Sequence, residues 1–150
     1  MEGINMRFDI ENQLSVEQAF TGSATVSTHS YKKQTAAQDI SIGRRMALML
    51  LPVVAAGAGS THTLEVIQAD DAALTSNVEA LASVEKLAAE LTLGDVIEIP
   101  IPQGVMDKQY IGFRNTATGG TTTLTADVYL VPQDEIAQYK SFPKVNNATV

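Results

Sequence analysis

Hydrophobic and polar residues alternate most regularly over residues 95–131, where the pattern predicts three β-strands joined by tight turns. Every second residue from 97 to 101 is isoleucine, and residues 109–114 alternate in the same way. The last strand, 121–131, has threonines and an aspartate on one face and four apolar residues on the other: Leu124, Ala126, Val128 and Leu130. A period of two over this length is typical of strands with one buried and one solvent-exposed face.

Earlier segments also have the composition of strands. Residues 23–30 alternate small apolar with polar side chains, and residues 61–68 place Leu64 and Val66 on one face. Residues 46–54 are apolar almost without interruption, which predicts a strand buried on both faces.

Two glycine-containing segments predict turns between these strands. Residues 55–60 read Ala-Ala-Gly-Ala-Gly-Ser, so we expect 45–68 to form a hairpin. Residues 118–121 read Thr-Gly-Gly-Thr and predict a second hairpin loop.

Residues 76–93 allow two interpretations. Apolar residues recur every three to four positions, Ser76 or Asn77 suits a helix N-cap, and Gly94 suits a helix end, so the segment fits an amphipathic helix. The alternative is a connection followed by a strand that crosses between sheets. Intrinsic helix propensity amounts to tenths of a kcal/mol per residue and is readily overridden by tertiary packing.

Seven or eight short strands separated by turns predict an all-β protein, a jelly-roll-like antiparallel β-sandwich. We expect an N-terminal extended segment over 1–20, the sandwich over 21–132 and an extended C-terminal arm over 133–150. The arm has no periodicity, so it is either disordered or ordered only on a neighbouring molecule.

Composition argues against several kinds of binding partner and reactive site in this 150-residue chain. The net charge is −7 with only ten lysines and arginines, which argues against direct nucleic-acid binding. Without cysteine there is no disulfide, thiolate metal site or cysteine nucleophile. The longest apolar run, 46–58, is broken by Pro52 and is shorter than the roughly 20 residues of a membrane span.

No group of residues has the spacing of a catalytic or metal site. The two histidines, His29 and His62, lie in polar stretches and are expected to face solvent. The neighbouring carboxylates Asp70 and Asp71 are too few for calcium and suit a turn. We therefore expect neither an enzyme nor a cofactor or metal ion.

Several short segments, taken in order, resemble the small capsid cement (decoration) proteins of tailed bacteriophages, of the Bordetella phage type. The segment 39–43, Asp-Ile-Ser-Ile-Gly, is similar to a family step Asp-Ile-Gly-x-Gly, with Ser41 in place of glycine. Residues 64–73 resemble a family strand followed by an Asp-Asp-Ala turn. Further similar segments are 8–15, 18–19, 22–24, 93–94, 99–102, 104–105, 109–113 and 119–120, followed by the threonine-rich strand.

The resemblance implies a jelly roll on the outer surface of an icosahedral virion, made in the bacterial host cytoplasm. It implies a protein that cements neighbouring major capsid subunits and associates with itself, as a homodimer or alternatively a trimer, without membrane contact. It also favours a strand over a helix within 76–93. Expected exposure of large or basic side chains gives the candidate contact residues Phe8, Tyr31, Lys32, Lys33, Tyr139 and Phe142.

Two other classes are weighed against this hypothesis. A carbohydrate-binding or host-attachment jelly roll predicts exposed aromatic residues along a groove, yet the chain has four tyrosines, four phenylalanines and no tryptophan. An enzyme such as a cupin needs several histidine ligands, and two scattered histidines do not supply them.

Overall fold

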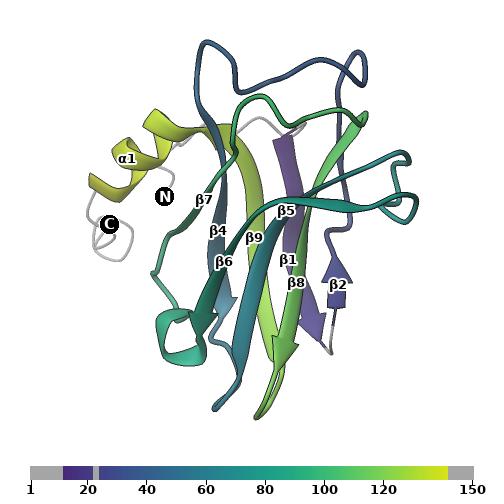
Figure 1. Cartoon of the computed structure of the whole chain (residues 1–150). Helices are drawn as coiled ribbons and strands as arrows, with labels where there is room; N and C mark the ends of the chain where they lie inside the picture. Colours follow the sequence, from purple (N-terminus) through teal and green to yellow (C-terminus); the bar gives the residue numbers. More distant parts are fainter. Residues whose placement is uncertain (1–11, 22–23, 142–150) are drawn as a thin grey trace.

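Two antiparallel β-sheets pack face to face in the computed structural model, which describes residues 12–21 and 24–141 (Figure 1). The first sheet contains, in spatial order, β1 (Gln13–Thr21), β9 (Thr123–Pro132), β4 (Met46–Val54) and β7 (Ile97–Pro100). The second contains β2 (Ala24–Val26), β8 (Tyr110–Thr118), β5 (Thr61–Ala69) and β6 (Glu79–Leu87), with β3 (Tyr31–Lys32) also paired to β8.

This strand order is that of a jelly roll, in which the chain repeatedly changes sheets. Strands β4 and β5 lie in different sheets, as do β6 and β7, and β8 and β9. All pairings are antiparallel. The all-β, jelly-roll-like antiparallel sandwich predicted from the sequence is confirmed.

The two predicted hairpins are wrong. Strand β4 pairs with β7 and β9, whereas β5 pairs with β6 and β8, so the connection 55–60 crosses between the sheets. The connection 119–122 likewise carries the chain from β8 to β9. A period of two tells which face of a strand is buried but not which strand lies beside it, and a glycine turn serves a crossing as well as a hairpin.

These two crossings touch each other at one end of the sandwich, which we call the crossing end. Gly57 donates its N–H to Thr123 O at 2.9 Å, and Thr121 donates its N–H to Ala58 O at 3.1 Å. A Cβ on Gly57 would lie 2.1 Å from Thr121 O, and one on Gly120 would lie 2.2 Å from Ala58 O. Gly120 also has a positive φ of 44°. Glycine is therefore required by close backbone approach at both positions.

The core lies between the sheets and is formed by the inward faces of the alternating strands. Phe20 and Phe113 meet edge to face at its centre, with ring centroids 5.2 Å apart. The apolar faces predicted for 97–101 and 121–131 are buried here. Strand β4 is buried on both faces as expected, with Leu48 and Leu50 in this core and Met49 on the opposite side.

The ambiguous segment 76–93 is mainly a strand, as the resemblance favours. Residues Glu79–Leu87 form β6, an edge strand paired only with β5, and Ala88–Glu90 form the short 3₁₀ helix η2. Leu81, Ala82 and Val84 pack against the core. A β-bulge opposite Val66 and Ile67 adds one residue to β6. The extra residue interrupts the alternation of apolar and polar positions, so the apolar residues recur at intervals like those of a helix.

The two ends of the described chain differ from the expected boundaries. Strand β1 pairs with β9 in the first sheet, so residues 13–20 are part of the sandwich. Residues Gln133–Ser141 form helix α1 and not an extended arm. Among its described side chains, 133–137, the helix packs by Ile136 onto Ala47, Met49 and Val131 on the outer face of the first sheet. The helix lacks a periodic apolar pattern in the sequence, so alternation and spacing did not predict it.

Part of the outer face of the second sheet, around Ile67 and Ala69, is covered by the loop 70–78. Leu74 is buried there with Ile67 and Ala69, although its φ is positive at 60°. Its side chain lies directly over Gly112, where an added Cβ would meet Leu74 Cδ1 at 2.3 Å. Asp71 holds the loop by accepting hydrogen bonds from the backbone N–H groups of Thr75 and Ser76.

Gly112→Ala is therefore expected to destabilise the protein by about 1–3 kcal/mol, because the new methyl group forces Leu74 from its site. Chemical denaturation measures the loss. In a Leu74→Ala background the same substitution finds space, so its effect falls by about half or more. An equal effect in both backgrounds would contradict the assigned contact.

Candidate functional site

Two long loops are joined at the end of the sandwich opposite the crossing end, which we call the loop end (Figure 1). They span 33–45, before β4, and 101–109, before β8. Asp39 accepts hydrogen bonds from Ser41 N and Gly104 N, at 2.9 and 2.5 Å. Gln103 Nε2 donates to Ser41 O at 2.7 Å, and the buried Ser41 hydroxyl donates to Ile101 O. The two loops thus form one preorganised surface.

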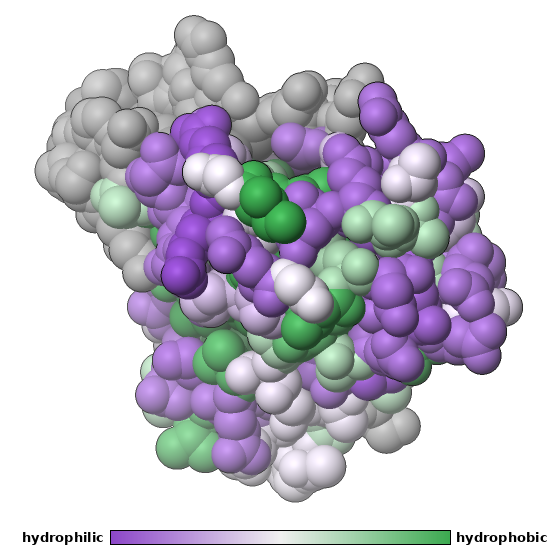
Figure 2. All heavy atoms as spheres, turned by 45° about the horizontal axis from the view of Figure 1, so that its top comes forward, coloured by the Kyte–Doolittle hydropathy of each residue, from purple (hydrophilic) through white to green (hydrophobic). Residues whose placement is uncertain are grey.

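Apolar side chains protrude from this surface. Ile42 is 67% exposed and Val105 is 45% exposed, and each directly follows a residue that ties the loops together. Figure 2 brings the loop end forward and shows hydrophobic side chains set among hydrophilic ones on this face. Together with Arg44 and Arg45, these two residues are the loop-end surface.

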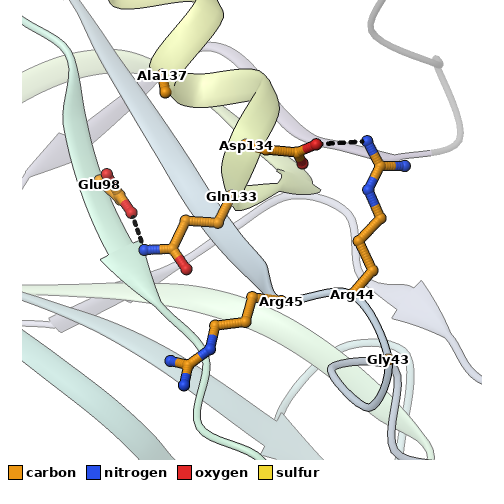
Figure 3. Close-up of a pocket in the computed structure, with 7 residues that line it drawn as sticks. All are labelled: Gly43, Arg44, Arg45, Glu98, Gln133, Asp134 and Ala137. Atoms are coloured by element: carbon orange, nitrogen blue, oxygen red, sulfur yellow. Dashed lines mark hydrogen bonds and ion pairs between the residues drawn. The ribbon is translucent and has the colours of Figure 1, made fainter.

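An open groove of about 540 Å³ lies where the loop meets α1 (Figure 3). Arg44 and Arg45 line it with Glu98, Gln133, Asp134 and Ala137. Arg44 Nη2 pairs with Asp134 Oδ2 at 3.1 Å and Glu135 Oε2 at 3.4 Å, which links the loop to the first turn of the helix. Gln133 Nε2 donates to Glu98 Oε2 at 2.5 Å. In Figure 3 the guanidinium of Arg45 points away from the carboxylates of Glu98 and Asp134.

The crossing end carries a second set of exposed apolar residues. Val54, Leu87 and Leu93 are 57%, 58% and 66% exposed, and we call them the crossing-end surface. Backbone hydrogen bonds hold their segments together, from Ala56 N to Leu91 O and from Ala88 N to Ser60 O, both at 3.0 Å. Both ends of the sandwich therefore present large apolar side chains on fixed loops or strand ends.

The predicted contact residues at the loop end have different environments. Tyr31 is half-buried and packs against the core, whereas Lys32 is exposed. Lys33 is buried, which corrects the expectation that it faces a partner. Its Nζ donates to Ala36 O at 2.9 Å and Gln38 O at 2.7 Å, so it braces the loop from within. Burial lowers the pKa of Lys33, while Asp39 and Asp107 oppose that shift.

The other predicted contacts are described in part or not at all. Phe8 and Phe142 lie outside the described residues. Tyr139 lies in α1, and its side chain is outside the described part of the structure. Sequence reasoning missed Ile42, Val105 and the crossing-end surface, because a single apolar residue beside a glycine or within an apolar strand looks like part of the core.

Ser60, His62 and Asn115 form a buried polar cluster beside the crossing. His62 Nε2 lies 2.9 Å from Ser60 Oγ, and its Nδ1 lies 3.1 Å from Asn115 Oδ1. His62 is fully buried, which corrects the prediction that it faces solvent, whereas His29 is exposed. Local pattern cannot place this side chain, because a histidine between threonines suits either face of a strand.

Serine beside histidine is the nucleophile–base pair of a hydrolytic triad, but here a neutral asparagine takes the place of the carboxylate and the hydroxyl donates elsewhere. Ser60 Oγ donates to Gly57 O at 2.7 Å, and Ser60 is 2% exposed. A hydroxyl with one hydrogen cannot also donate to His62. The cluster therefore holds the crossing in place.

Two further searches concern the described part of the chain alone. It contains no group of three or more histidine, aspartate or glutamate side chains placed to hold a metal ion. Helix α1, with nine residues, is too short to cross a lipid bilayer, and no described helix is long and apolar enough to do so.

No protein-family model matches the chain, and no curated protein matches it. One solved structure that it is similar to is the Clostridium thermocellum xylanase 10B fragment with CBM22-1 and GH10 modules, complexed with xylohexaose. The similarity has 13% sequence identity and a TM-score of 0.36, and covers 84% of this chain but only 27% of that one. A likeness this loose carries no information on function.

Ser60→Ala is expected to lower the free energy of unfolding by about 1–3 kcal/mol, because it leaves Gly57 O and His62 Nε2 buried without this partner. Ser83→Ala, at an exposed position of β6, is the matched control and changes stability little. Thermal and chemical denaturation measure both. Equal stability of the two variants would show that the cluster does not hold the crossing.

The ion pair of Arg44 predicts a pH dependence. Its hydrogen bond lowers the pKa of Asp134 below the ordinary 3.8, so the pair stabilises the loop–helix contact above that pH and is lost as pH falls through the lower, folded value. Arg44→Gln should raise the titration midpoint of the Asp134 carboxyl, measured by NMR. Arg45→Gln is the control, and an unchanged midpoint in Arg44→Gln would refute the pairing.

Proposed function

We propose that this chain is a structural virion protein that binds the outside of an icosahedral phage capsid and cements neighbouring major capsid subunits against internal pressure. One observation carries the proposal: exposed apolar side chains gather on fixed loops at both ends of a β-sandwich. A protein that bridges two subunits needs two separated contact surfaces and a stiff body between them.

The body between the surfaces is suited to that task. Strand β4, which runs from the loop end to the crossing end, has nine residues, equivalent to about 30 Å at roughly 3.3 Å per residue. It is central in its sheet and buried on both faces. A force applied at one end is therefore transmitted along paired strands and not through a flexible linker.

The stabilising effect of such a brace follows from general binding thermodynamics. A ligand that binds only the assembled shell stabilises that shell by mass action. Specific contacts bury on the order of 1,000 Å² or more in total, and many copies per shell add multivalency. The segments that resemble cement proteins support the same assignment, with the major capsid protein and further copies of this chain as partners.

A carbohydrate-binding or host-attachment module is the second candidate. Such a site stacks sugar rings on exposed aromatic faces, yet the described aromatic side chains are withdrawn from solvent. Phe20 and Phe113 are buried, and Tyr31, Tyr110 and Tyr129 are half-buried. No observation on the described residues favours this candidate over the capsid brace.

Binding to expanded phage heads that lack the chain tests the proposal by co-sedimentation. Ile42→Asn at the loop end and Leu93→Asn at the crossing end should each weaken binding roughly tenfold, because both replace exposed apolar contacts. Val16→Asn is the matched control, since Val16 is 55% exposed but lies within β1, between the two ends. Failure of the unmodified chain to bind heads would remove the proposed function.

A further inference from the structure

Two segments of the loop end carry a net positive charge in an acidic chain. Segments 31–45 and 101–109 together hold five lysines and arginines and two aspartates, a net charge of +3 in a chain of net charge −7. Neither aspartate is freely available, because Asp39 accepts backbone hydrogen bonds and Asp107 accepts one from Gln68 Nε2 at 2.8 Å. These two segments thus differ in sign from the rest of the chain, and the adjoining carboxylates Glu98, Asp134 and Glu135 are engaged by Gln133 and Arg44.

Arg45 is the arginine of this surface that is free to bind a partner. Arg44 is held by Asp134 and Glu135, and Lys33 is buried against backbone carbonyls. The exposed guanidinium of Arg45 has neither a hydrogen bond nor an ion pair with another described residue. Its backbone is fixed, because Arg45 O accepts a hydrogen bond from Gln133 N at 2.8 Å.

We propose that the loop end binds an acidic protein surface, on which a carboxylate pairs with Arg45 while neighbouring apolar groups pack against Ile42 and Val105. Arginine presents a rigid fork that matches a carboxylate. The exposed apolar residues beside it favour a folded protein partner over a polyanion, because phosphate backbones are bound by many cations and not by isoleucine and valine. The inference rests on the proposed function, in that it names the chemistry of the capsid surface met by this end.

Arg45→Gln and Ser83→Asp form a matched pair of variants for the test. Each lowers the net charge by one, but Ser83 lies in the middle of β6, away from the loop end. The probe is expanded, undecorated phage heads. Arg45→Gln should weaken head binding on the order of tenfold, and Ser83→Asp should leave it nearly unchanged. The affinity of the unmodified chain should also fall from 50 to 300 mM NaCl more steeply than that of Arg45→Gln.

The outcomes separate this inference from the proposed function. If the unmodified chain does not bind heads, the proposed function fails. If it binds and Arg45→Gln binds equally well, the inference alone is overturned. Micromolar binding of a 30-base-pair DNA duplex that is lost in Arg45→Gln would also overturn it, because the surface would then recognise phosphate and not a protein carboxylate.

Discussion

The close backbone approach of the two crossings is the constraint on which the sandwich depends. Gly57 and Gly120 lie against Thr121 and Ala58 so closely that neither position has space for a Cβ. The chain changes sheets at both points, which places β4 beside β9 in one sheet and β5 beside β8 in the other. The buried cluster of Ser60, His62 and Asn115 lies at the same end, and its Ser60 hydroxyl donates to Gly57 O within the first crossing.

Rigidity at both ends lowers the entropy cost of binding through the exposed apolar residues. A mobile loop loses conformational entropy when it binds, whereas loops already fixed by hydrogen bonds do not. At the loop end, Asp39 and Ser41 supply that order from inside the turn, and Lys33 adds two contacts to carbonyls. At the crossing end, bonds from Ala56 and Ala88 hold the segments that carry Val54, Leu87 and Leu93. The proposed binding surfaces are thus extensions of the same hydrogen-bond framework that closes the fold.

The alternation of apolar and polar residues predicted which face of each strand is buried, but it did not predict which strands pair with each other. Leu124 and Val128 were placed inward because alternation reports the face of a strand. The partners of β4 and β5 depend on sheet exchange, which no local pattern encodes. Of the candidate site, the sequence indicated only the loop after Tyr31 and misjudged Lys33, whose buried ammonium donates to the carbonyls of Ala36 and Gln38. It missed Ile42 and Leu93, because exposure of a single apolar residue is decided by tertiary structure.

If the sandwich bridges two capsid subunits as proposed, both of its ends must touch the shell at once. Site-specific photo-crosslinkers at positions 42 and 93, analysed by mass spectrometry on decorated phage heads, measure this. We expect crosslinks from position 42 and from position 93 to the major capsid protein, with doubly substituted chains joining two capsid subunits into one product. Crosslinks from only one end, with the other end free in decorated heads, would contradict it.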